Sequence, residues 1–183
     1  MFDINKIRNP RFYAQNRLPA HSDHIVFASR QEVIDADGKD WDAVNDINSY
    51  RMSLTGLWKF HYDKNMTQAS VAIDGFDSCD YDCKCWDDIY VPAHIQMEGY
   101  DVPLYANVQY PWDGKENIWS AGNEEDALSG IPTQFNPTAT YVKYFTLPEN
   151  MKNKRIFVSF QGVESGFALW LNGEYVGYSE DSF

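Results

Sequence analysis

The chain has 183 residues, of which 44% are hydrophobic, and its formal net charge is −12. A chain of this length can bury one sizeable core, and its acidity argues against nucleic acid or an anionic membrane surface as partners, because few cations are present to neutralise phosphates. No stretch of the sequence approaches the ~18 consecutive apolar residues that a membrane span needs.

The start of the chain and its cysteines indicate a compartment. The first 21 residues contain no apolar segment of the kind found in secretory signals, so we expect a cytoplasmic protein. Cys79, Cys83 and Cys85 lie in one short segment. Three cysteines placed in this way do not make a disulfide framework. Their spacing also lacks the paired ligands of a zinc site, and no histidine lies in the same loop. Free thiols are the preferred interpretation, and their role stays open.

Residues 1–50 are polar and have no steady hydrophobic period. The stretch 9–21, NPRFYAQNRLPAH, has two prolines and irregularly spaced apolar residues, which is typical of an extended arm lying on another surface. Residues 30–46 are acidic and contain an Asp-Gly turn signal, and a short helix and an ordered loop are both compatible with them. We therefore treat 1–50 as an extended N-terminal arm.

The remaining residues, 51–183, are expected to form one domain of short strands separated by turns. Five segments are expected to contain strands: 53–63, 86–95, 139–148, 154–163 and 166–179. Pro92 and Pro148 are expected to end two of these strands, since proline cannot donate to a strand ladder. The last segment is expected to form a hairpin around Asn172-Gly173, because both positions tolerate the positive φ of a type I′ turn. The pattern favours an all-β sandwich, although periodicity does not separate a jelly roll from an immunoglobulin-like sandwich.

No motif in the chain joins a catalytic nucleophile to its base, and no pair of carboxylates stands out for glycosidic acid–base chemistry. The remaining candidates are Asn107, in the proline- and aromatic-rich stretch 103–112, and Asp181. An amide can donate to and accept from a sugar hydroxyl, and a carboxylate can accept hydroxyl protons or bind a hard cation. Taken alone, each residue is more readily read as part of a turn.

Five blocks of sequence, in this order, carry a resemblance to a known family: NPRFYAQNRLPAH (9–21), LTGLWKFHY (54–62), VPAHIQMEGYDVPLYANVQYP (91–111), NPTATYVKYFTLP (136–148) and VSFQGVESGFALWLNGEYVGYSEDS (158–182). Together they closely resemble the N-terminal sugar-binding domain of bacterial cytoplasmic β-galactosidases of glycoside hydrolase family two. The related β-glucuronidases and β-mannosidases share this domain but match the block GYDVPLYANVQYP less well. The resemblance implies a jelly-roll, galactose-binding-like β-sandwich, incomplete at its C-terminus and belonging to a longer polypeptide.

The resemblance also implies roles for particular residues. Asn107 would reach into the active-site pocket and touch the galactosyl unit of the substrate. Asp181 would contact a galactosyl hydroxyl and ligate a sodium ion, with magnesium bound elsewhere in the full enzyme. The arm at 9–35 would help to build a homo-oligomer. The two catalytic glutamates of the family lie in a downstream (β/α)₈ barrel. We therefore expect no catalytic residue in this chain, and no hydrolysis of galactosides such as lactose by the chain alone.

Some positions depart from the family pattern and leave alternatives open. Ile95 and Ala106 replace residues that are common in the family, and the insertion 112–135 is longer than usual. Trp112 and Trp119 of this insertion either line the substrate cleft or pin the loop. Two other interpretations of the chain stay open: an independent carbohydrate-binding module, and a purely structural part in assembly. The preferred aglycone and the number of subunits do not follow from the sequence.

Overall fold

The computed structural model describes residues 3, 6, 7, 9, 11–22, 24–66, 68, 69, 75–103, 107 and 135–180. Its main helices and strands are β1 (Ala14–Gln15), α1 (Arg30–Ala36), α2 (Trp41–Ile47), β2 (Gly56–Asp63), β3 (Asp87–Val91), β4 (Thr138–Val142), β5 (Gly166–Leu171) and β6 (Glu174–Glu180). Short 3₁₀ turns form at Ile95–Met97 and Glu149–Met151. Among these described residues, no helix has the length and apolar character needed to cross a bilayer.

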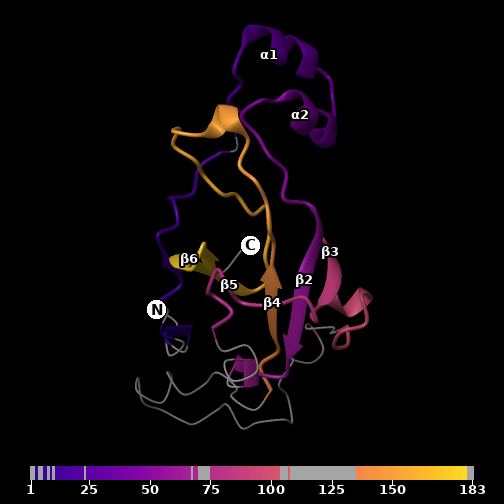
Figure 1. Ribbon diagram of the computed structural model, residues 1–183, viewed down its shortest axis with the longest axis vertical. Coiled ribbons are helices and arrows are strands. Elements are labelled where there is room, and N and C mark those ends of the chain that lie inside the picture. Colours follow the sequence, from indigo (N-terminus) through magenta and orange to yellow (C-terminus); the bar gives the residue numbers. More distant parts are fainter. Residues whose placement is uncertain are drawn as a thin grey trace.

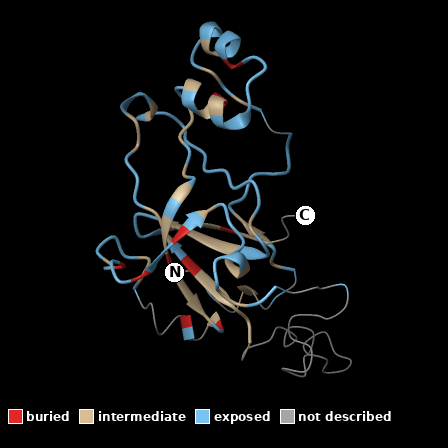
Figure 2. Cartoon of the chain, turned by 90° about the vertical axis from the view of Figure 1, so that its right-hand side faces the viewer, coloured by how far each residue is buried: buried red, intermediate tan, exposed pale blue. Residues whose placement is uncertain are grey.

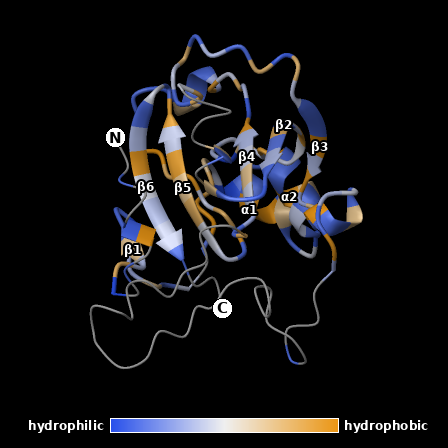
Figure 3. Cartoon of the chain, turned by 90° about the horizontal axis from the view of Figure 1, so that it is seen from below, coloured by the Kyte–Doolittle hydropathy of each residue, from blue (hydrophilic) through white to orange (hydrophobic). Residues whose placement is uncertain are grey.

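The strands form two antiparallel sheets, with the orders β1-β6-β5 and β3-β2-β4. In the view from below, β5 and β6 stand on one side of the molecule, and β2, β3 and β4 stand on the other (Figure 3). Helices α1 and α2 lie together at one end, beyond the ends of the strands (Figure 1). The predicted all-β sandwich is confirmed.

The β5–β6 hairpin forms around the predicted turn. Leu171 pairs with Glu174 across it, and Asn172 and Gly173 have φ angles of 51° and 84°. Positive φ at both central residues is what a type I′ turn requires, and such a turn matches the right-handed twist of the flanking strands. The prediction of a hairpin at this dipeptide is therefore confirmed.

The most deeply buried side chains belong to β2 and β3, where Phe60 is 1% exposed and Ile89 is 2% exposed. A further cluster packs beside this sheet and consists of Ala69, Cys83, Trp86, Phe76, Tyr81 and Val142. Phe76 also contacts Trp170 of β5, with ring centroids 5.1 Å apart, so this cluster links the two sheets. Buried residues lie mainly in and beside the strands, whereas most of the surface of the two helices is exposed (Figure 2).

The prediction of a strand within 154–163 is wrong. These residues form no strand, and side chains of both parities are exposed: Ile156 is 47%, Phe157 57% and Val158 48% exposed. The β propensity of a residue reflects how well its side chain fits a paired, half-buried sheet surface. No described strand pairs with 154–163, so the β-forming residues of this segment have no such surface. The strand predicted in 139–148 is confirmed, but it ends at Val142, before Pro148 could stop it.

Residues 30–47 take the helical alternative. Ser29 caps α1, where its hydroxyl accepts from Glu32 N at 3.2 Å while Glu32 Oε2 accepts from Ala28 N at 2.9 Å. Asp40 caps α2 by accepting from Ala43 N at 2.9 Å. Such caps satisfy backbone N–H groups that have no partner within the helix. The N-terminal arm is therefore extended only in part.

Candidate functional site

Of the two candidate residues, Asn107 and Asp181, the structure describes only Asn107. Asn107 lies in a turn and is exposed to solvent. Asp181, which directly follows β6, lies outside the described residues, as do Trp112 and Trp119. Asn107 therefore lies at the surface of the protein.

Tyr100, seven residues before Asn107, is anchored to the sheet. The Tyr100 ring meets the ring of Phe60 edge-on, with centroids 4.5 Å apart. Its hydroxyl donates a hydrogen bond of 2.7 Å to Oδ2 of Asp87, the first residue of β3. Edge-to-face contacts of this kind add to the stabilisation that burial provides. Tyr100 is thus tied to both β2 and β3.

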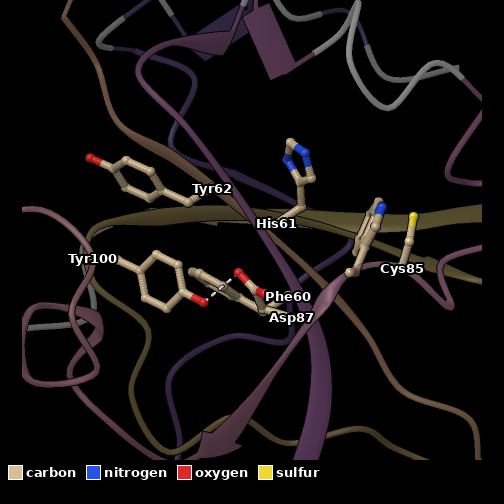
Figure 4. Close-up of a pocket in the computed structure, with 7 residues that line it drawn as sticks. Phe60, His61, Tyr62, Cys85, Asp87 and Tyr100 are labelled. Atoms are coloured by element: carbon tan, nitrogen blue, oxygen red, sulfur yellow. Dashed lines mark hydrogen bonds between the residues drawn. The ribbon is translucent and has the colours of Figure 1, made fainter.

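A cleft opens beside this anchor. It has a volume of about 270 Å³, and Figure 4 shows its lining residues, which are Phe60, His61, Tyr62, Cys85, Trp86, Asp87 and Tyr100. The cleft forms where β3 begins at Asp87, opposite Phe60, whereas β2 continues to Asp63 and, among the described strands, pairs there with β4 alone. The edge of β2 is therefore open over its last residues.

The polar groups of the cleft already have partners. The hydrogen bond to Asp87 is the main cause that raises the pKa of Tyr100 to about 12. Burial, followed by the nearby Asp101 carboxylate, raises the pKa of Tyr62 to about 12. Both phenols are therefore protonated at neutral pH, and their protons point to carboxylates. His61 Nδ1 lies 2.9 Å from Asp63 Oδ2.

The cleft can offer hydrogen-bond acceptors to a small polar molecule. Phe60 and Trp86 are 1% and 7% exposed, so they form its floor and offer no free ring face for a sugar to stack on. The phenol and carboxylate oxygens remain as acceptors for ligand hydroxyls. No group of three or more metal-ligating side chains occurs among the described residues.

The described residues next to Asp181 form the C-terminal end of β6. Arg17 of the arm donates to Ser179 Oγ at 2.9 Å and to the Glu180 carbonyl at 3.1 Å. The Tyr178 hydroxyl donates to Glu180 Oε1. Burial, and secondarily this hydrogen bond, raises the pKa of Tyr178 well above its usual value. The residues just before Asp181 are therefore held by side chains from both the arm and β6.

Sequence reasoning missed these supporting residues. The pair Tyr100–Asp87 spans 13 positions, and Arg17–Ser179 spans 162 positions. No spacing rule connects residues so far apart. The one available signal was that Tyr100 stands in the same sequence block as Asn107, seven residues before it.

Comparison with known proteins gives a family match and similarity along nearly the whole of this chain. Residues 51–183 match the model of the glycosyl hydrolases family 2 sugar binding domain. The chain is 45% identical over 181 residues to a protein named beta-galactosidase from Halalkalibacterium halodurans, which covers 99% of this chain and 16% of that protein. A beta-galactosidase from Streptococcus thermophilus is 38% identical over 177 residues, covering 97% of this chain and 15% of that protein. A beta-galactosidase large subunit from Latilactobacillus sakei is 32% identical over 185 residues, covering 99% of this chain and 28% of that protein. The chain therefore spans between 15% and 28% of the length of these relatives.

Proposed function

Because the chain belongs to the sugar-binding domains of glycosyl hydrolase family 2, we propose that it is the substrate-side N-terminal domain of a β-galactosidase. The observation that carries this proposal is the identity of 45% to a protein named beta-galactosidase over 99% of the chain. The full-length protein would hydrolyse terminal β-D-galactosides such as lactose with retention of configuration. A retaining enzyme needs two carboxyl groups roughly 5–5.5 Å apart, and these would come from a separate (β/α)₈ catalytic domain.

Asn107 is the residue through which this chain would act on the substrate. Its amide offers both a donor and an acceptor, which matches a sugar hydroxyl. It is exposed, and Tyr100, seven residues before it, is anchored on Phe60 and Asp87. A group held in place before binding loses less entropy when the ligand arrives. The rigid sandwich would thus present the amide to a pocket completed by the catalytic domain.

Asp181 would contact a second hydroxyl of the galactosyl unit and provide one ligand of a sodium ion. Its carboxylate chemistry fits a hard cation, since such ions prefer oxygen ligands. The other sodium ligands would be further oxygen atoms of the full-length protein or water. No residue of this chain is assigned to magnesium.

The test of this function uses the full-length protein and purified galactosides. Asn107→Ala is expected to lower kcat/KM by about ten- to a thousandfold, or roughly 1.4–4 kcal/mol of transition-state stabilisation. Asp181→Asn is expected to weaken activation by sodium. Asn45→Ala, on helix α2, removes the same amide away from the two sheets and serves as the control. If Asn107→Ala keeps the kcat/KM of the control, Asn107 does not belong to the site.

A stand-alone carbohydrate-binding module is the alternative, and the cleft beside Tyr100 is the observation that favours it. Calorimetric titration of the 183-residue chain with galactose separates the two. Submillimolar affinity supports the module, and the absence of heat supports a wall lent to a larger active site. Comparing hydrolysis of β-galactosides, β-glucuronides and β-mannosides by the full-length protein distinguishes the sister activities.

The assembly and compartment of the protein complete the proposal. The full enzyme would be a homo-oligomer with the N-terminal arm at its subunit contacts. Mixing the chain with an enzyme that lacks this arm, and assaying for restored activity, tests that role. The enzyme would work in the cytoplasm, which is supported by the free thiols of Cys79, Cys83 and Cys85, since reducing compartments keep thiols free.

A further inference from the structure

The segment 154–163, which leads into β5 (Figure 1), exposes apolar side chains to solvent. Ile156 is 47%, Phe157 57%, Val158 48% and Phe160 38% exposed. Single exposed apolar residues are ordinary on a protein surface, whereas several large ones in so short a stretch are typical of an interaction site. We therefore expect another part of the protein to cover this segment.

The backbone of this segment is unpaired as well. Among the described residues, no backbone–backbone hydrogen bond involves an N–H or C=O group of 155–163. The backbone polar groups of a folded protein normally have a partner, most often in secondary structure. A row of unpaired N–H and C=O groups that carries β-branched and aromatic side chains is what an open sheet edge presents to another strand. The segment thus has both the side chains and the backbone groups to accept a strand.

The apolar surface of the segment continues onto β5. The Phe160 ring meets the Phe167 ring of β5 with centroids 4.9 Å apart. Leu171 lies four residues after Phe167, so the two-residue period of a strand puts it on the same side of β5, and it is 51% exposed. In an extended conformation, Ile156 and Val158 would point to the same side as Phe160. One apolar side therefore runs from the segment onto β5.

The two sheets also have open edges next to this segment. Their orders, β1-β6-β5 and β3-β2-β4, place β5 at the edge of one sheet and β4 at the edge of the other. In the view from below, the two sheets face each other through these two strands (Figure 3). The segment belongs to the connection between β4 and β5. Proteins normally pair or cover such edges, because an open edge pairs with other chains.

We propose that 154–163 accepts a β-strand from the part of the full-length protein that lies outside this chain. The partner strand has a defined chemistry. Its backbone pairs with the backbone of the segment, and every second side chain is apolar, so that it extends the apolar side formed by Ile156, Val158 and Phe160. The inference goes beyond the proposed function, because it does not depend on any activity toward galactosides.

Length and charge favour this source of the strand. The chain spans between 15% and 28% of the length of its relatives, so a full-length protein of that size has ample further chain to provide a strand. A strand tethered to the same polypeptide binds at a high effective concentration. A second copy of this chain is the other occupant, but each copy has a net charge of −12, and like charges repel.

Hydrogen exchange in the full-length protein tests the pairing. At least alternate amides between 156 and 161 are expected to exchange about a hundredfold or more slower than in an unstructured peptide, because paired strand amides exchange only when the strand opens. This protection is expected to stay the same when the protein is diluted. Exchange at the rate of an unstructured peptide would overturn the inference, and protection lost on dilution would assign the segment to a second copy and overturn it too.

Two glutamate variants of the full-length protein test which side is covered. Val158→Glu is expected to accelerate exchange of the segment's amides by about tenfold or more, because it places a carboxylate on the buried apolar side. Ser159→Glu adds the same charge at the neighbouring position of opposite parity and is expected to stay within about threefold of wild type. Val158 and Ser159 are both exposed in the described structure, so a difference between the variants requires a partner from outside this chain.

The remaining outcomes also decide the inference. If Val158→Glu fails to fold while Ser159→Glu folds, the partner strand is supported in the same way, whereas equal exchange in the two folded variants would overturn it. All of these readouts are independent of catalysis. Absence of galactoside hydrolysis in the wild-type protein would refute the proposed function and leave the strand inference to be decided by exchange alone.

Discussion

Gly177 offers the sharpest test of how the N-terminal arm is held. Replacing it with alanine would place a Cβ 2.6 Å from the carbonyl oxygen of Gln15 and 3.7 Å from the carbonyl carbon of the same residue. The crowded atom belongs to the backbone, so it cannot move aside as the end of a side chain can. Because β1 is only two residues long, we expect Gly177→Ala to push the arm off β6 and to leave the β5–β6 hairpin in place.

The expected effect of Gly177→Ala depends on the free-energy cost of the clash and on the stability of the arm on β6. Forcing an extra carbon into a packed contact costs about 1–3 kcal/mol. At 1.4 kcal/mol for each factor of ten, this corresponds to an increase of about 5- to 150-fold in the population with a released arm. The arm's hydrogen bonds contribute only ~0.5–1.5 kcal/mol each against an ordering cost of ~1–2 kcal/mol per residue, so little excess stability is available to absorb the clash.

Two rates report release of the arm. Exchange of the Glu180 amide, which bonds to Tyr13, and tryptic cleavage after Arg17 are both expected to accelerate by that factor in Gly177→Ala. Gly162→Ala is the matched control, because a Cβ at Gly162 has no atom within 4 Å. If Gly177→Ala and Gly162→Ala show the same two rates, the arm does not lie on β6 in the described register.

Three other predictions concern the β2 sheet and the exposed segment. Because the pKa of Tyr100 is raised from 10.0 to about 12, folding favours its protonated form, so its contribution to stability is present below pH 10 and is lost as pH rises toward 12. The difference in unfolding free energy between wild type and Tyr100→Phe should shrink over that range, and a constant difference would contradict the hydrogen bond to Asp87. Phe60→Ala is expected to cost about 3–5 kcal/mol in urea unfolding, whereas Leu57→Ala, at a position 61% exposed, should stay within about 0.5 kcal/mol. In the 183-residue chain, Val158→Glu should also stay within about 0.5 kcal/mol, because Val158 is 48% exposed; a cost of several kcal/mol would place it in a core.

Features that depend on neighbouring residues were predicted well from the sequence. The alternation in 53–63 became β2, and the Asn172-Gly173 dipeptide became the turn of the β5–β6 hairpin. Both depend on local rules, namely the two-residue period of a strand and the positive φ of a tight turn. The segment 154–163 shows where such rules stop, since it places Ile156, Val158 and Phe160 on one parity but no described strand pairs with it.

The sequence by itself determined the class of fold, the hairpin, the family blocks and the candidacy of Asn107 and Asp181. Only the tertiary structure decided which residues support these two candidates. It brought Tyr100 to Asp87, and it brought Arg17 to the end of β6 from 162 positions away. Backbone geometry and turn chemistry act over a few neighbouring residues, so they can be read along the chain. Contacts between distant segments depend on how the whole chain packs, and no local pattern records them.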